Sequence, residues 1–385
     1  MSYVPSCCYC PNLLALRMRA RGELLIVAGL AILKVMLVAF AVMVSAIVNP
    51  DYPLPHQPCI NLWNQWDARH YLSIAAHGYG PSGDARLCLA FWPLYPAAIW
   101  LVNLVANDLM LSALLVSTVA STVAALELYW LARLDHSDNT ALLAVASLFL
   151  FPTSYFLHIG YSEALFLALV LGSFLAVRAA SWPRAGFLAA LASLTHVNGV
   201  LLMPALGAEA LLAMWRTHKF RLEPSLAYLG SPLLAVASYL LFNYLLTGDS
   251  LAFLTVEHQN WEHHTVLPWH SIADMLGMAR GGGYNGEMAG VQGLLFIGLG
   301  GVLTVISAVL LPVSYTVWMA TNWLLMTSQS WDISAPRYAL ALFPMFMLIA
   351  RAAQRWPLPG AAAGFWSLLW LATFTAQFIA GHWTF

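Results

Sequence analysis

Residues 24–48 have the sequence LLIVAGLAILKVMLVAFAVMVSAIV, and this run sets the class of protein to which the chain belongs. Lys34 is its one charged residue. A bilayer hydrocarbon core about 30 Å thick is crossed by about 20 apolar residues in a helix, so we expect a membrane-spanning helix here. The run is too long for the core of a cleavable signal peptide, which has about 7–15 apolar residues, and no cleavage site follows it.

The residues before this run indicate its orientation. Three arginines precede it, Arg17, Arg19 and Arg21. Because cytoplasmic flanks of membrane helices are rich in Lys and Arg, we expect residues 1–22 to form a cytosolic tail. The same tail contains three cysteines, Cys7, Cys8 and Cys10. We interpret them as reduced thiols or lipid attachment sites, because a structural zinc ion needs four ligands and nothing nearby completes the set.

Apolar runs continue along the 385-residue chain, in which 61% of residues are hydrophobic and 9% are charged. Soluble domains carry about 25% charged residues. We therefore predict an all-α fold, a polytopic transmembrane helical bundle of about 11 spans that forms one domain over residues 1–385. The net charge of −1 offers no basic surface for nucleic acid. The predicted spans lie near residues 23–48, 109–132, 140–158, 162–180, 185–198, 199–215, 225–246, 291–310, 312–328, 336–351 and 359–381.

The segment at 91–106 is also apolar, but its prolines and aromatic residues suit a helix that lies at the membrane interface. If this segment is not a span, every basic loop falls on the cytoplasmic side, as the positive-inside rule requires. The basic residues concerned are Arg17, Arg19, Arg21, Arg133, Arg178, Arg184, Arg216, Lys219, Arg221, Arg351 and Arg355. Residues 49–108 then form a first external loop with interfacial helices, and residues 247–290 form an external loop rich in His, Trp and Gly.

The first external loop contains WNQWDARHY at residues 63–71, where a carboxylate lies among basic and aromatic residues. A carboxylate at a membrane–water boundary can serve as a general base, so Asp67 is a candidate catalytic residue. The alternative is a structural carboxylate that pairs with Arg69 or caps a short helix. Glu163 begins a later apolar segment on the same side. It either stabilises the helix dipole or acts in catalysis by holding a substrate hydroxyl or orienting the base.

Cationic groups are also expected on the external side. Arg337 and Tyr338 begin an apolar segment there, where a guanidinium could bind a lipid phosphate through its fixed fork of donors. The alternative is a salt bridge between Arg337 and Asp332. One external loop contains four histidines, His258, His263, His264 and His270. They could bind phosphate, or they could belong to a solvated interfacial loop, and their spacing matches no zinc motif, so we predict no metal site.

Other polar groups interrupt the apolar segments. Thr195-His196-Val197-Asn198-Gly199 separates two short apolar segments, and polar backbone at membrane depth occurs where it faces protein or a wet cavity. We therefore expect this break to border a cleft. Cys59 and Cys88 share the external loop, where a disulfide would need an oxidising compartment. Glu127 and Lys34 lie inside apolar segments and are interpreted as structural.

Several of these motifs, in this order, resemble the PIG-V family of mannosyltransferases in glycosylphosphatidylinositol assembly. The motifs are Trp66-Asp67-Ala68-x-His70-Tyr71, Phe91-x-Pro93-Leu94-Tyr95-Pro96, Tyr161-Ser162-Glu163, and Arg337-Tyr338 with Phe343-Pro344. The resemblance extends from about residue 60 to residue 350 and implies the GT-C class of membrane glycosyltransferases. Where members of the family often carry Thr-Arg, this chain has Thr195-His196. A histidine there keeps a donor but carries only a conditional charge, so we expect donor binding to depend more on pH.

The resemblance implies an inverting mannosyltransferase that uses a lipid-phosphate sugar, such as polyprenyl- or dolichyl-phosphate mannose. It implies that Asp67 is the base and that Glu163 belongs to the same site. Donor or substrate contacts are expected from Trp66, Arg69, His70, His196, His258, His263, His264, Arg337 and Tyr338. Trp92 and Tyr95 are expected near the lipid head group. We expect no cofactor, an acceptor that is a lipid or protein glycan, and an active site facing the periplasm, exterior or ER lumen. The alternatives are a transporter or lipid flippase, and a purely structural membrane subunit.

Overall fold

The computed structural model describes residues 13–48, 59–217, 224–330 and 333–385, without the side chains of 13–19, 216 and 217. Within these ranges the regular secondary structure is helical. The one β-type contact there is an isolated antiparallel bridge between Thr265 and Gln329. The predicted all-α fold is therefore confirmed. Three groups of predicted residues lie outside the described side chains: the tail cysteines and arginines (Cys7, Cys8, Cys10, Arg17, Arg19), the basic residues Arg216, Lys219 and Arg221, and Asp332.

The helices follow one another with short connections. The α-helices are α1 Leu13–Val48, α2 Asp67–His77, α3 Asp84–Leu87, α4 Leu94–Ala106, α5 Leu109–Arg133, α6 Asp138–Phe149, α7 Glu163–Arg178, α8 Trp182–Thr195, α9 Leu202–Thr217, α10 Ser231–Thr247, α11 Ala252–Trp261, α12 Pro268–Gly281, α13 Gly283–Asn285, α14 Gly293–Leu310, α15 Val313–Thr327, α16 Ala335–Tyr338, α17 Pro344–Arg355 and α18 Pro357–Ile379. The 3-10 and π segments are η1 Cys59–Trp63, η2 Cys88–Ala90, η3 Ser154–Leu157, η4 Val197–Leu201, η5 Pro224–Gly230, η6 Gly286–Gln292 and η7 Ala339–Ala341.

In the described part of the chain, six helical stretches are long and apolar enough to cross a membrane, or seven if α3 to η2 and α4 form one bent span. The chain is accordingly an integral multi-pass membrane protein. The expected number of about 11 spans is not confirmed. Several predicted spans fold into helices too short for a hydrocarbon core of about 30 Å, since a helix rises about 1.5 Å per residue. The run at 140–158, for example, gives the 12-residue α6 and then η3.

The segment before α5, which the sequence predicts to be an external loop, positions α2 beside α4. Residues Asp84–Ala90 and Leu94–Ala106 are bent by 115° at the break between them. The 13 residues of α4 pack against α2 and α5 and leave Trp100 and Val105 exposed. The interfacial position of this helix stays a prediction. Cys59 and Cys88, whose pairing the sequence left open, are both free thiols.

The core of the bundle is α7, which packs against α5 and α8. Small residues on α5, such as Ala124 and Ala125, are fully buried and allow the helices to approach closely. The Asp108 carboxylate caps α5 by accepting a hydrogen bond from the Leu111 amide at 2.8 Å. The side chains of α1 from Leu24 to Val48 include many exposed apolar residues, which fits a helix surrounded by lipid.

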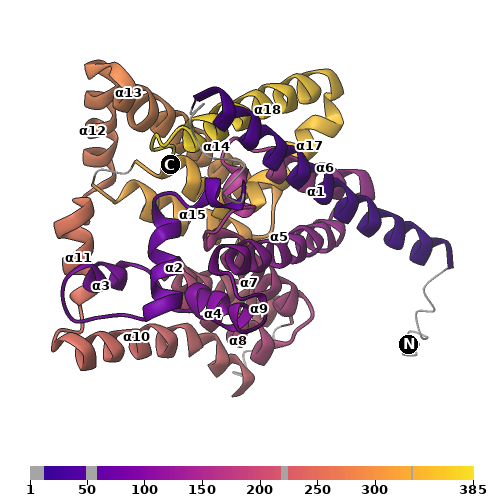
Figure 1. The fold of residues 1–385 in the computed structure, drawn as a ribbon. Coiled ribbons are helices and arrows are strands. Elements are labelled where there is room, and N and C mark those ends of the chain that lie inside the picture. Colours follow the sequence, from indigo (N-terminus) through magenta and orange to yellow (C-terminus); the bar gives the residue numbers. More distant parts are fainter. Residues whose placement is uncertain (1–12, 49–58, 218–223, 331–332) are drawn as a thin grey trace.

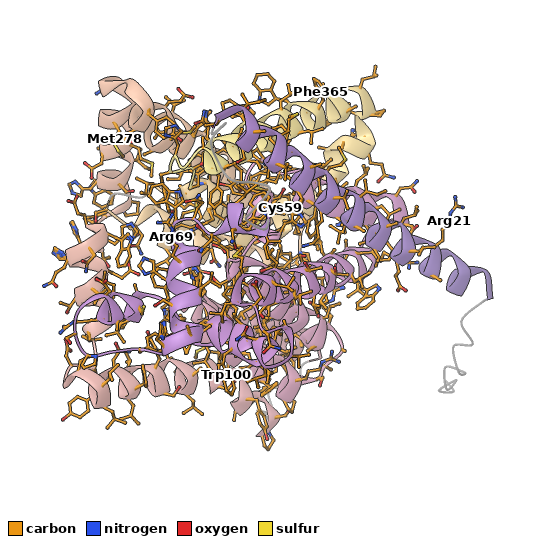
Figure 2. All side chains as sticks on the ribbon, viewed as in Figure 1. Arg21, Cys59, Arg69, Trp100, Met278 and Phe365 are labelled. Carbon is orange, nitrogen blue, oxygen red and sulfur yellow. The ribbon has the colours of Figure 1, made fainter. Side chains whose placement is uncertain are left out.

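In Figure 1, α10 runs nearly horizontally along the bottom of the view, and α5 crosses its centre with a slight slope. Arg21, near the start of α1, lies at the right-hand edge of the view, and Arg69, on α2, lies left of its centre (Figure 2). The α2 and α11 helices lie left of the centre of the view, away from the N-terminal end of α1 at the right (Figure 1).

Candidate active site

Arg337 brings the two candidate carboxylates together. Its Nη1 donates to Asp67 Oδ2 at 2.7 Å, and its Nε lies 3.3 Å from Glu163 Oε1. The side chains of Arg337, Asp67 and Glu163 are 8%, 15% and 12% exposed. A largely buried cation thus holds two carboxylates whose sequence positions are far apart. We refer to these three residues as the ionic triad.

The two carboxylates of the ionic triad stand at helix starts, and Arg337 lies in the four-residue α16. Asp67 is the first residue of α2, and Glu163 is the first residue of α7. Trp66, directly before Asp67, has φ 51° and ψ −123°, a conformation that is costly for a residue with a side chain. The Tyr71 hydroxyl is 2.8 Å from the Ser162 hydroxyl and so ties α2 to the start of α7. These contacts determine the spacing of the two carboxylates.

The guanidinium of Arg337 is surrounded by aromatic rings. Its Cζ lies 5.4 Å from the ring centre of Phe156, 5.7 Å from Tyr161, 5.3 Å from Tyr338 and 6.0 Å from Trp383. A cation over such rings is attracted by their negative faces. The backbone of α16 is also held, because the Thr153 hydroxyl donates to the Pro336 carbonyl at 2.9 Å. The arginine is therefore restrained on several sides.

Two adjoining cavities meet at this site. The carboxylate cavity has a volume of about 1000 Å³ and is lined by Trp66, Asp67, Arg69, His70, Arg337 and Trp383, among others. The histidine cavity has a volume of about 740 Å³, and its walls include His258, His264, Trp92, Leu251, Leu254 and Met326. Both are lined by Tyr71, Phe91, His196, Glu257, His263 and Tyr338. Glu163 lines a small void of about 20 Å³ together with Arg337 and His196.

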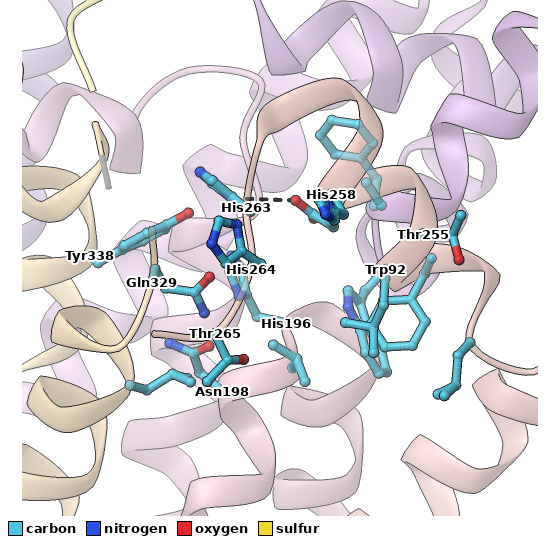
Figure 3. A pocket seen from close by; sticks show the side chains of 18 of the residues that line it. Trp92, His196, Asn198, Thr255, His258, His263, His264, Thr265, Gln329 and Tyr338 are labelled. Carbon is cyan, nitrogen blue, oxygen red and sulfur yellow. Dashed lines mark ion pairs between the residues drawn. The ribbon is translucent and has the colours of Figure 1, made fainter. Parts of the chain in front are cut away.

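The loop histidines lie on one wall of the histidine cavity (Figure 3). His263 Nδ1 is 3.4 Å from Glu257 Oε2, and both residues stand between the two cavities. His264 Nδ1 is 2.9 Å from the Ser330 hydroxyl, and its ring centre is 5.4 Å from that of His258. Three of the four loop histidines thus gather in one place, whereas His270 lines neither cavity.

The break between α8 and α9 borders both cavities, as the sequence indicated. His196 has an extended backbone, with φ −155° and ψ 138°, and its side chain lines both cavities. Gly199 follows, where a Cβ would lie 2.3 Å from the Ser193 amide nitrogen. Asn198 also lines the histidine cavity, and its amide donates to Asn322 Oδ1 at 3.3 Å. Only glycine fits at position 199, because its backbone passes so close to the backbone of Ser193.

Burial shifts several pKa values at the site. Burial raises the pKa of Glu163 to about 7, although the charge of Arg337 opposes the shift. Burial, reinforced by Arg337, lowers the pKa of His196 to about 4, so this imidazole is neutral near pH 7. Burial also lowers the pKa of His70, whose ring stacks on Phe91 at 4.8 Å. These groups lie outside the six candidate spans.

The remaining predicted residues differ in their surroundings. Arg69 is exposed and donates to the Asn64 carbonyl at 3.2 Å and to Gln65 Oε1 at 3.0 Å. Among the described residues no carboxylate forms an ion pair with Arg69, so its charge faces the carboxylate cavity unneutralised. Trp92 lines the histidine cavity. Tyr95, expected near a lipid head group, is instead fully buried, and its hydroxyl is 2.9 Å from that of Ser117.

Several cavity residues were not expected from the sequence, and three of them bear on the chemistry. Glu257 stands between the cavities, and Tyr284 and Trp383 line the carboxylate cavity. The sequence shows that Glu257 lies in the histidine-rich loop, but nothing in residues 381–385 distinguishes Trp383 from an ordinary aromatic residue.

In the part of the chain that the structure describes, no group of three or more His, Cys, Asp or Glu residues is arranged to hold a metal ion. Lys34, within α1, donates to the Thr118 hydroxyl at 3.0 Å.

Comparison with known sequences gives a consistent assignment. The sequence model of the family described as mannosyltransferase (PIG-V) matches residues 54–266. GPI alpha-1,6-mannosyltransferase 2 of Rattus norvegicus is 31% identical over 149 residues, which are 36% of this chain and 30% of the rat protein. The protein of the same name from Cricetulus griseus is 33% identical over 150 residues, which are 36% of this chain and 29% of that protein. The matched region spans less than a third of the length of these curated relatives.

Solved structures show a distant similarity. ArnT from Cupriavidus metallidurans, bound to undecaprenyl phosphate, has a TM-score of 0.48 and 13% identity over 90% of this chain and 76% of that chain. The oligosaccharyltransferase AglB from Archaeoglobus fulgidus, in complex with an inhibitory peptide and a dolichol-phosphate, has a TM-score of 0.43 and 12% identity over 91% of this chain and 56% of that chain.

Proposed function

Because this chain belongs to the mannosyltransferase (PIG-V) family, we propose that it is a glycosyltransferase that uses a lipid-phosphate sugar as donor. The family membership confirms the resemblance that the motifs indicated. The proposed reaction moves mannose from polyprenyl- or dolichyl-phosphate mannose to an acceptor hydroxyl on the extracytoplasmic face. One observation carries the proposal: the carboxylate of Asp67 lines a large cavity and is oriented by Arg337 beside Glu163.

The proposed step is a single displacement with inversion at the anomeric carbon. The acceptor oxygen forms a bond to that carbon, and the bond to the lipid phosphate oxygen breaks, leaving its electron pair on the phosphate. Asp67 accepts the proton that the acceptor hydroxyl loses. A positioned general base of this kind contributes about 10²–10⁴-fold to the rate. One carboxylate base suffices for one displacement, so Glu163 is free for a positioning role.

The contacts of Arg337 indicate that it binds the carboxylates and that other donors bind the leaving phosphate. Its guanidinium contacts the carboxylates of Asp67 and Glu163, so we expect it to orient these two groups. The leaving phosphate also needs fixed donors. Arg69 faces the same cavity with its charge unneutralised by a described carboxylate, and His196 is a neutral donor at the junction of the two cavities. We propose these two residues, with His263, as the phosphate contacts.

The two cavities suit two different substrates. The histidine cavity has apolar walls that include Trp92, Leu254 and Met326, which suit the first units of an isoprenoid chain. The carboxylate cavity carries the charged and hydrogen-bonding groups, which suit a hydroxyl-bearing acceptor. Because His196 lines both cavities, a donor phosphate beside it would lie between the isoprenoid chain in one cavity and the acceptor in the other.

The extracytoplasmic orientation rests on charge. The described arginines of the basic loops are Arg21, Arg133, Arg178, Arg184, Arg351 and Arg355. Of these, Arg178, Arg351 and Arg355 line a separate cavity that shares no residue with the catalytic ones. Arg21 lies at the far end of α1, well separated from Arg69 in the view of Figure 2. If basic residues remain cytoplasmic, the carboxylate cavity opens away from the cytosol. Among the described residues and the comparisons, no observation favours the transporter or flippase alternative.

The test is transfer by the purified protein in detergent micelles, with radiolabelled polyprenyl-phosphate mannose and a panel of alkyl glycosides, glycolipids and serine-containing peptides. Asp67→Asn should lower the turnover of the folded protein by about 10²–10⁴-fold. Asp84→Asn is the matched control, because Asp84 is an exposed carboxylate in the same loop that lines neither cavity. It should retain normal turnover.

Near-normal turnover of Asp67→Asn would remove the assignment of the base. Failure of the wild-type protein to transfer mannose to any acceptor of the panel would remove the proposed activity. NMR analysis of the product also tests the stereochemistry, because a retained anomeric configuration would contradict a single displacement.

A further inference from the structure

The segment after α18 folds back into the catalytic side of the bundle. Gly381 has φ +82°, which a residue with a side chain rarely adopts, and the His382 amide donates to the Gln377 carbonyl at 3.0 Å. Beyond the turn, the Thr384 carbonyl accepts a hydrogen bond from Tyr155 at 2.6 Å, and the Phe385 ring lies 4.8 Å from that of Phe374. These contacts hold the segment in place.

Trp383 stands between these anchors and lines the carboxylate cavity. Its ring meets Trp66 edge-on, with the ring centres 5.2 Å apart and the planes at 88°. Its backbone carbonyl accepts a hydrogen bond from the Tyr284 hydroxyl at 2.8 Å. The Arg337 guanidinium lies 6.0 Å from its ring centre. Trp383 therefore shares a wall with Trp66, the residue directly before the proposed base.

The indole N–H of Trp383 has no hydrogen-bond acceptor among the described residues, although the nitrogen is buried. Tryptophan can only donate through this atom, and buried donors in folded proteins are almost always paired. Two neighbours of the cavity share this state: Glu163 Oε2 and His196 Nδ1 are also buried without a partner among the described residues. Unpaired polar atoms thus surround the place where Asp67 meets Arg337.

We propose that Trp383 and Trp66 form an aromatic wall against which the acceptor sugar ring packs, and that the Trp383 N–H donates to an oxygen of that acceptor. The inference rests on the proposed function. A pyranose has apolar C–H groups on its faces and oxygens around its rim, and indole offers an apolar face and one donor to match them. Trp383 lines the carboxylate cavity and not the histidine cavity, so it serves the acceptor rather than the lipid chain.

The first experiment separates acceptor from donor. Trp383→Phe keeps an aromatic ring and removes the N–H, so it should raise the KM for octyl mannoside about 3–10-fold, as expected for one lost hydrogen bond. The KM for polyprenyl-phosphate mannose should stay unchanged. Trp366→Phe is the matched control, because Trp366 lies on α18 with 61% of its surface exposed, and it should leave both constants unchanged.

A measurement on the wild-type protein covers the case in which Trp383→Phe is unstable. Hydroxyl-radical footprinting read by mass spectrometry should show Trp383 protected by octyl mannoside and not by polyprenyl phosphate, with Trp366 unaffected. An unchanged acceptor KM in folded Trp383→Phe, or equal protection by the two ligands, would overturn the role of Trp383 while the transferase activity stands. Absence of transfer by the wild-type protein would overturn both.

Discussion

Arg337→Gln should destabilise the protein more than the loss of any surface ion pair. The substitution leaves Asp67 and Glu163 side by side, 15% and 12% exposed, with no guanidinium between them. Removing one partner of a buried ion pair costs about 3–5 kcal/mol. The cost should stay near that of one pair, because Glu163, whose pKa is already about 7, can take a proton and leave only Asp67 charged.

The free energy of unfolding in detergent micelles, measured at pH 7 with a chemical denaturant, tests this expectation. Arg133→Gln is the control, because the Arg133–Asp138 pair at 3.2 Å is 28% and 25% exposed and should contribute less than about 1 kcal/mol. Asp67→Asn combined with Arg337→Gln removes the remaining charge. The double variant should therefore be more stable than Arg337→Gln alone, by about 0.5–3 kcal/mol.

Two results would refute this reasoning. One is a loss of stability in Arg337→Gln no larger than that in Arg133→Gln. The other is a double variant that is less stable than Arg337→Gln, since that would mean that Asp67 is not strained by the loss of its partner. Either result would show that the ionic triad is not the buried charge network that its exposures indicate.

Two further predictions concern the surroundings of the triad. Burial raises the pKa of Glu163 from its ordinary 4.5 to about 7. Between pH 4.5 and pH 7, Glu163 therefore holds a proton in the folded protein that it has released in the unfolded chain. The stability of the wild type relative to Glu163→Gln should fall as the pH rises from 4.5 to 7 and level off above it; a flat difference across denaturation curves at several pH values would contradict this. Gly199→Ala should lower stability and move His196, because the added Cβ would lie 2.3 Å from the Ser193 amide nitrogen. The control is Gly207→Ala, where no atom lies within 4 Å of the added Cβ. An unaltered melting temperature and full transfer activity of Gly199→Ala would count against this close contact.

Much of the candidate site could be found from local patterns. The residues at 66–71, 163 and 337–338 stand out because charged groups next to apolar segments are costly and so carry chemistry or pair with one another. The same residues belong to the motifs that resemble the PIG-V family. The break at Thr195–Gly199 was visible because polar residues interrupt two apolar segments, and the structure places His196 at both cavities.

The sequence alone determined that this is an all-helical membrane protein, because the length and polarity of each apolar run are properties of that run by itself. It did not determine how many runs become full spans, since packing against α5 and α8 lets short helices such as α7 be buried. Only the tertiary structure decided that Asp67 and Arg337, 270 positions apart, form a 2.7 Å contact, and that Trp383 faces the same cavity. Such contacts depend on how distant helices pack, and no local pattern encodes that packing.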